Sequence, residues 1–183
     1  LALDYFSERG PAAGIDVDYE RDRYFGMLKN YFIADGGEDS LGREREDTSQ
    51  HDVRGRFLFR HRQYLEDDWQ ISLELSYLSD KSFLEEFFEK EFDTGKEQET
   101  LLYLKKQRDN WAFTAALQAR ILDFTTQTER TPDFSLHLAG ESLANGATWF
   151  SENRAGIVRY RAAAQTFREF LRDGPTLSYG SPA

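Results

Sequence analysis

The segment from Trp69 to Tyr77 alternates strictly between apolar and polar residues, and this alternation constrains the fold more than any other feature of the chain. Its apolar members are Trp69, Ile71, Leu73, Leu75 and Tyr77, and its polar members are Gln70, Ser72, Glu74 and Ser76. A period of two places the two sets on opposite faces of an extended strand. The segment therefore predicts a β-strand with one apolar face and one polar face.

Two environments fit such a strand. Trp and Tyr side chains favour the level where hydrocarbon meets the headgroups of a bilayer, so the apolar face could contact lipid. At about 3.3 Å per residue and a tilt of about 40°, Trp69 and Tyr77 would lie about 20 Å apart along the membrane normal, close to the roughly 25 Å apolar band of an outer-membrane barrel. A half-buried strand of a soluble β-sandwich gives the same alternation, so the pattern leaves both environments open.

Composition excludes several classes of protein. Aromatic residues make up 15% of the 183 residues, which argues against disorder. No apolar run approaches the roughly 20 residues of a transmembrane helix. The net charge of -10 argues against a nucleic-acid partner, because such binding depends on Lys and Arg contacts to phosphate. The chain has no cysteine, so it forms neither disulfides nor thiolate metal sites.

Short strands separated by turns account for most of the chain. We expect strands at residues 3–6, 15–19, 24–33, 54–65, 69–78, 100–107, 111–124, 134–138, 147–151 and 156–161. The predicted fold class is all-β, an antiparallel meander of about eight to ten strands. No internal linker or repeat of fixed period is present, so residues 1–183 are treated as one unit. The chain starts at LALDYF without an initiator Met or a signal segment, and we expect it to be a fragment.

Two connecting segments stand apart from the strands. Residues 34–52 are acidic, glycine-rich and free of aromatic residues, which predicts a long, solvent-exposed loop. In residues 80–92, Leu84, Phe87, Phe88 and Phe92 recur at helical spacing, with Glu85, Glu86, Glu89 and Glu91 on the other side. This segment predicts one short amphipathic helix within a connector between two strands.

Motifs for catalysis, cofactors and metals are not found. The glycines form no dinucleotide-binding or phosphate-binding loop, and His51, His61 and His137 do not have a metal-binding spacing. No nucleophile elbow is present. We therefore expect a protein that is not an enzyme and that binds no cofactor and no metal. A β-rich hydrolase that uses acids such as Glu74 or Asp123 ranks last, because nothing in the spacing requires a pair of carboxyl groups.

The basic stretch RGRFLFRHRQ is the candidate binding element. In a strand, Arg56, Arg60 and Arg62 share one face. The planar guanidinium group suits phosphate, so this row of arginines could contact the phosphorylated head of a glycolipid. The favoured interpretation is structural, with these arginines paired to acids of neighbouring strands inside a polar lumen.

An ordered set of features gives the chain a family resemblance over about residues 54–161. The features are a strand that ends in Tyr77, Ser79 and Asp80, an aromatic and acidic connector at 83–92, an Asn-Trp pair at Asn110 and Trp111, a TQTE-type turn, and Pro132. In this order they resemble the barrel region of the LptD (organic solvent tolerance) family of outer-membrane lipopolysaccharide-assembly proteins.

The resemblance implies part of a transmembrane β-barrel in the cell outer membrane, which translocates lipopolysaccharide and inserts it into the outer leaflet. Implied partners are lipopolysaccharide, outer-membrane lipids, a plug lipoprotein and a periplasmic lipopolysaccharide bridge. The chain departs from the family pattern because it lacks a periplasmic jelly-roll domain and cysteines, and its strands are too few for a large barrel. The alternative is a small complete outer-membrane barrel, or a soluble β-sandwich that binds lipid or carbohydrate.

Overall fold

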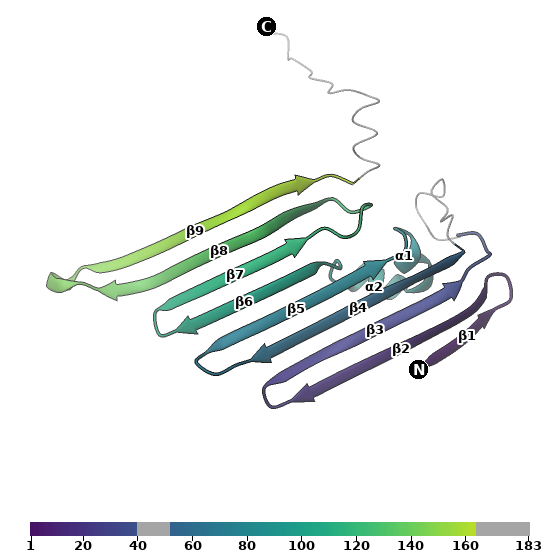
Figure 1. The fold of residues 1–183 in the computed structure, drawn as a ribbon, viewed down its shortest axis with the longest axis horizontal. Helices are drawn as coiled ribbons and strands as arrows, with labels where there is room; N and C mark the ends of the chain where they lie inside the picture. The colour runs from purple at the N-terminus through teal and green to yellow at the C-terminus, as the bar shows by residue number, and fades with distance from the viewer. Residues whose placement is uncertain (40–51, 164–183) are drawn as a thin grey trace, which may run out of the picture.

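A single antiparallel sheet dominates the structure, a computed structural model that describes residues 1–39 and 52–163. Its nine strands follow one another in sequence order, and each is hydrogen-bonded to the next (Figure 1). Strands β1 and β9 lie at opposite edges, so the sheet is open (Figure 1). The predicted all-β meander is confirmed, and its open form is consistent with part of a barrel. That residues 1–183 form one unit stays a prediction.

Five of the first six predicted strands have the expected boundaries to within one residue, but the strand expected at 15–19 is longer and runs from Gly10 to Arg21. The strands are β1 (Ala2–Phe6), β2 (Gly10–Arg21), β3 (Tyr24–Ala34), β4 (Val53–Tyr64), β5 (Trp69–Leu78), β6 (Thr100–Arg108), β7 (Trp111–Ala119), β8 (Gln127–Ser142) and β9 (Thr148–Arg161).

The prediction was wrong at β7, β8 and β9. Strand β7 ends at Ala119 rather than at residue 124, and the three short strands predicted after it are parts of β8 and β9. A TQTE-type turn was expected before Pro132, but Gln127, Thr128 and Glu129 lie in β8, which continues through Pro132 and Gly140. Register shifts against β9 between Arg130 and Asp133, and again between Ala139 and Glu141, accommodate them as bulges.

The connectors differ at the two ends of the strands (Figure 1). The connections at residues 22–23, 65–68, 109–110 and 143–147 are short, and they lie at one end, called here the short-turn end. The opposite end, called the long-connector end, carries the turn at 7–9 and the connections at 35–52, 79–99 and 120–126.

The register extends the alternation of β5 across its neighbours. Glu74 lies opposite Arg60 on β4 and Leu101 on β6, whereas Leu73 lies opposite His61 and Leu102. One side, the polar face, carries Lys29, Arg54, Arg56, Arg60, Arg62, Ser72, Glu74, Ser76, Lys105, Thr114 and Gln118. The other side, the apolar face, carries Ile15, Val17, Leu28, Phe57, Phe59, Ile71, Leu73, Leu75, Leu102, Leu104 and Leu117. Leu73 and Glu74 therefore point to opposite sides of the sheet, as predicted.

The connector between β5 and β6 forms two short helices instead of one. Helix α1 spans Phe83–Phe87 and helix α2 spans Glu89–Thr94. Phe88 separates them with a non-helical backbone, at φ -142 and ψ 48. Its ring lies against Tyr31 of β3, with 5.3 Å between centroids, so packing against the sheet accompanies the break. No helix in the described parts of the chain is long and apolar enough to cross a membrane.

A small core joins these helices to the polar face near the long-connector end. Phe83 and Ile33 are 0% and 1% exposed, and Tyr31 and Leu78 are also buried. Leu84, Phe87 and Phe88 pack against this core. Two details of the predicted apolar stripe were wrong: the most deeply buried ring is Phe83, and Phe92 is 41% exposed. The break at Phe88 interrupts the helical repeat between α1 and α2, so the spacing read from α1 does not apply to Phe92.

Removal of the Phe83 ring tests this core. Phe83→Ala is expected to lower the free energy of unfolding by about 3 to 5 kcal/mol, because it leaves a cavity where a fully buried ring was. Urea titration followed by aromatic fluorescence measures the change. Glu89→Ala is the control, since Glu89 is exposed at the start of α2 and its truncation should leave the midpoint nearly unchanged.

The two faces are tested by one substitution made on each side. If Leu73 lies near the bilayer midplane, Leu73→Arg is expected to cost about 2 to 4 kcal/mol of folding free energy in phospholipid vesicles, because the charge would then lie in hydrocarbon. Leu101→Arg changes the same residue type on the polar face, beside Glu74, and should cost far less. Equal costs for the two variants would rule out a lipid-facing apolar side.

Candidate functional site

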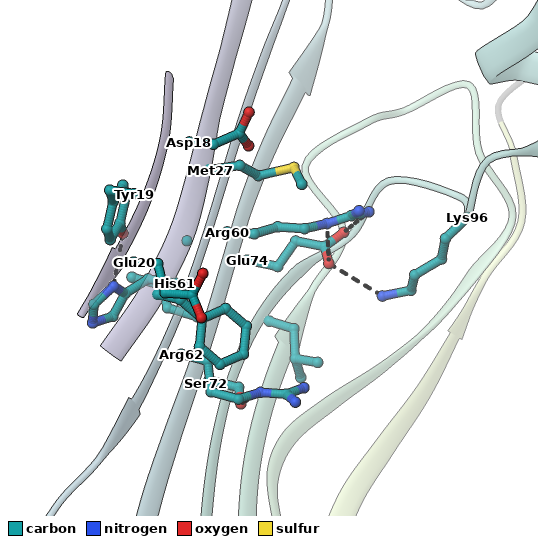
Figure 2. Close-up of a pocket in the computed structure, with 14 residues that line it drawn as sticks. Asp18, Tyr19, Glu20, Met27, Arg60, His61, Arg62, Ser72, Glu74 and Lys96 are labelled. Atoms are coloured by element: carbon teal, nitrogen blue, oxygen red, sulfur yellow. Dashed lines mark hydrogen bonds and ion pairs between the residues drawn. The ribbon is translucent and has the colours of Figure 1, made fainter. Parts of the chain in front are cut away.

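A hollow of about 710 Å³ lies on the polar face, toward the middle of the sheet. Its polar-face lining comes from strands β2 to β6 and from the connector before β6: Asp18, Glu20, Phe25, Met27, Arg60, Arg62, Ser72, Glu74, Lys96 and Leu101. Figure 2 shows Arg60, Glu74 and Lys96 converging from two strands and the connector. The hollow combines basic, acidic and apolar side chains.

Glu74 is the fixed centre of this hollow. Arg60 donates through Nε to Oε2 at 3.0 Å and through Nη2 to Oε1 at 3.3 Å. Lys96 Nζ donates to Oε2 at 3.2 Å, and the backbone N–H of Glu99 donates to Oε1 at 3.1 Å. Both carboxylate oxygens therefore accept hydrogen bonds. Glu74 is buried, with 8% of its surface exposed. Loss of the Glu74 charge would leave Arg60 and Lys96 without their partner, so Glu74→Gln should be more harmful than its place on a polar face suggests.

Arg62 has a different environment. Its Nε donates to Ser72 Oγ at 3.3 Å, and its guanidinium carbon lies 5.7 Å from the centre of the Phe25 ring. No carboxylate in the described parts of the chain pairs with it. The side chain is exposed at the rim of the hollow, so most of its hydrogen-bond donors point to solvent. Arg62 is therefore the cation best placed to bind an external anion.

The three arginines predicted as candidates thus fall into different settings. They share one face of β4, as predicted, but only Arg60 and Arg62 line the hollow. Arg56 is 3% exposed and lies beneath α2, with Nη1 2.8 Å from Glu91 Oε2 and its guanidinium carbon 3.7 Å from the centre of the Phe88 ring. Arg56 holds the connector to the sheet. Contact between these arginines and a glycolipid phosphate stays a prediction.

A buried ion-pair cluster lies beyond Arg56, at the long-connector end. Arg54 is 3% exposed, and its guanidinium group donates to Asp35 at 2.8 Å, to Asp39 at 2.6 Å and to Asp80 at 2.7 Å. Arg9 pairs with Asp35, Asp39 and Glu86. The Arg54 cluster, defined as Arg9, Asp35, Asp39, Arg54, Asp80 and Glu86, thus joins the turn after β1, the segment after β3, strand β4, the end of β5 and helix α1.

Two predictions about these acids were wrong. The segment after β3 was expected to be exposed throughout, but the Asp35 and Asp39 side chains are 1% and 5% exposed. The remainder of that predicted loop, residues 40–51, lies outside the described residues. Glu86 was expected on the solvent side of the helix, yet its side chain is 6% exposed and pairs with Arg9. Sequence spacing did not reveal these pairs, because the acids and arginines come from different connectors.

Burial and ion pairing have opposite effects on the pKa values of two acids in the cluster, Asp39 and Asp80. Burial opposes ionisation of the Asp80 carboxyl, but hydrogen bonds from Arg54 and Ser79 outweigh it and hold the pKa below its ordinary value. Asp39 has the same balance of burial against hydrogen bonds from Arg54 and Ser82, and its pKa is also lowered. Both acids therefore stay ionised at neutral pH, as buried partners of an arginine must.

A histidine that could be mistaken for a site residue lies on the opposite side of the sheet. The Tyr19 hydroxyl is 2.7 Å from His61 Nδ1, and both side chains point away from Arg60 and Glu74 (Figure 2). The Tyr19 ring covers Gly26, where an added Cβ would meet that ring. This arrangement fills the gap on the apolar face and gives His61 a structural role.

A second hollow of about 550 Å³ lies on the polar face of β6 to β9. Arg154 pairs with Asp133 there, through Nε at 2.8 Å from Oδ1, while His137, Glu152 and Ser135 complete a polar lining. The polar face is therefore hollowed over both halves of the sheet.

Acid is expected to release the connector helices. Because the pKa values of Asp39 and Asp80 are lower in the folded protein than the ordinary value of about 3.9, these acids contribute stability above about pH 4, and this is lost as pH falls through their folded pKa values. Hydrogen exchange of the α1 amides, corrected for intrinsic rates, should show the loss. Asp80→Asn should lower the protection of the α1 amides already at neutral pH. Full protection of these amides in the unsubstituted protein at pH 2 would contradict the role of the cluster.

Comparison with known families identifies the sheet. The model of the family described as LptD: LPS transport system D matches residues 52–168, which is well over half of the 183 residues. The match begins just before β4 and includes β9, so it contains the connector helices, Arg54, Arg60 and Arg62. Strands β1 to β3 precede it and continue the same sheet. A search of curated proteins gave no match. On the family match, the chain belongs to the LptD family.

Proposed function

We propose that this chain forms part of the wall of an outer-membrane barrel that moves lipopolysaccharide and inserts it into the outer leaflet. LptD family proteins are outer-membrane proteins that act in lipopolysaccharide transport, which makes lipopolysaccharide the expected substrate. The separation of the sheet into an apolar and a polar face carries the proposal. The apolar face would meet lipid and the polar face would line the lumen. No observation favours a small complete barrel or a soluble β-sandwich over this proposal.

The hollow around Glu74 supplies the chemistry for substrate contact. Lipopolysaccharide presents phosphate groups close to acyl chains. The exposed donors of Arg62 suit phosphate, and Phe25, Met27 and Leu101 provide apolar surface beside them. Glu74 neutralises Arg60 and Lys96. This balance favours weak, transient contact over tight binding, which is what a substrate in transit requires.

The proposed role is transport without catalysis. Glu74 was the acid considered for a hydrolase, and its two oxygens accept hydrogen bonds from Arg60, Lys96 and the Glu99 backbone. Both oxygens are therefore occupied by contacts within the protein. The inward groups of the hollow are better suited to guiding a charged amphiphile than to cleaving a bond.

The remaining partners are proposed on family grounds. A plug lipoprotein would contact the lumen side, and a periplasmic bridge would deliver lipopolysaccharide to the barrel. The edges of β1 and β9 pair with no strand in the described parts of the chain, so both can accept further strands and extend the wall.

Site-specific photocrosslinking in cells tests the substrate path. A photoreactive phenylalanine analogue placed at Ser72, on the polar face, is expected to crosslink to lipopolysaccharide, because Ser72 lines the hollow next to Arg62. The same analogue at Phe59, on the apolar face of the neighbouring strand, is the matched control and should crosslink mainly to phospholipid. Crosslinking of lipopolysaccharide from position 59 but not from 72 would exclude the proposed lumen path.

A further inference from the structure

The apolar face of β1 to β7 is chemically different at its two ends. Next to the longer connectors it carries only uncharged residues: Leu3, Tyr5, Ala13, Phe32, Ala34, Val53, Gly55, Tyr77, Thr100 and Ala119. Next to the short turns it carries three basic side chains and no acidic one, and these are Arg21, Lys106 and Arg108. We call these three residues the basic belt. Hydrogen bonding between the strands does not require this difference in charge between the two ends. The difference therefore indicates a partner outside the sheet.

Each member of the basic belt lies beside an aromatic ring on the same face. Arg21 is opposite Tyr24, and Arg108 is opposite Trp111. Lys106 is opposite Trp69, and its Nζ lies 5.0 Å from the centre of that ring. Rings of this kind settle at the boundary between hydrocarbon and headgroups, so they fix the depth of the basic groups beside them.

The level set by these rings is where lipid phosphates lie. Lys and Arg extend their apolar stems along the surface and keep the charged end at the headgroups. An ammonium or guanidinium group at that level attracts the phosphate of a lipid. The basic belt therefore has the chemistry and the position to hold phosphate groups at the edge of the apolar band.

Acidic residues close to the belt compete only weakly for it. Arg108 Nε lies 3.7 Å from Asp68 Oδ2, with side chains 55% and 59% exposed. Such an exposed pair contributes little and is easily exchanged. The other nearby acids lie in the turns, beyond the ends of the strands that carry the belt: Asp22, Glu66, Asp67 and Asp109.

We propose that the basic belt binds the phosphate groups of phospholipids in the leaflet at the short-turn end of the sheet. Short turns of outer-membrane barrels face the periplasm, which assigns the belt to the inner leaflet. The proposal goes beyond lipopolysaccharide transport, and it rests on the proposed contact between the apolar face and lipid. The belt would hold the barrel wall at a fixed depth while substrate passes along the other face.

Adjacent lysines on opposite faces provide the test. The protein is folded from urea into phosphatidylcholine vesicles with and without phosphatidylglycerol, and the partition constant is measured by tryptophan fluorescence. Phosphatidylglycerol should raise the partition constant of the unsubstituted protein. Lys106→Gln is expected to reduce this gain in the partition constant by up to about five-fold, the effect of one basic residue at an anionic surface. Lys105→Gln removes the same charge from the polar face and should leave the gain unchanged. The triple variant R21Q/K106Q/R108Q should remove most of it.

The outcomes separate this proposal from the proposed function. Equal effects of Lys105→Gln and Lys106→Gln, or an unchanged gain in the triple variant, would overturn the basic belt while leaving transport intact. Failure of the protein to enter any vesicle, with no quenching of tryptophan by brominated lipid tails, would instead count against the lipid-facing side as a whole. A loss in the triple variant that appears with lipopolysaccharide-containing vesicles and not with phosphatidylglycerol would assign the belt to the outer leaflet and overturn the inner-leaflet proposal.

Discussion

The antiparallel register is the constraint on which every other feature of this protein depends. Side chains alternate along each strand, and a shift of one residue would exchange the two faces of a strand. Glu74 lies beside Arg60 and Leu101 because three strands keep this register. The same register places Leu73 beside Leu102 on the other side. The hollow, the apolar face and the basic belt are all consequences of it.

A second constraint acts at the long-connector end, where charged groups are buried together. Arg54 is 3% exposed and would be costly to bury without its carboxylate partners. Those partners come from segments far apart in the sequence, so the ion pairs form only when the connectors fold back onto the sheet. Phe83 and Phe87 add apolar contact at the same place, and the Arg54 guanidinium carbon lies 5.4 Å from the centre of the Phe87 ring. Charge pairing and ring packing together hold the connector helices on the polar face.

This arrangement divides the polar face into a covered part and an open part. Arg56 lies under α2 and serves the connector, whereas Arg62 is open to the hollow. In the proposed barrel, the covered part would narrow the lumen near the long-connector end. The open part would give a charged amphiphile a path along the wall. Under the proposed function, the polar face would line the lumen and the apolar face would meet lipid, which is consistent with membership of the LptD family.

The sequence by itself determined the strands from β3 to β6, the two faces of the sheet and the family. Alternation at 69–77 is local and survives any tertiary arrangement, so β5 and the opposite orientations of Leu73 and Glu74 could be read from it. The position of Arg56, Arg60 and Arg62 on one face of β4 could also be predicted from the period of two. Only the tertiary structure decided which arginine pairs with a connector acid, because Asp35, Asp80 and Glu91 meet the arginines of the sheet only when the connectors fold back onto it. It also decided the break at Phe88 and the continuity of β8 through Pro132, since long-range packing and strand pairing override local preferences for helix and turn.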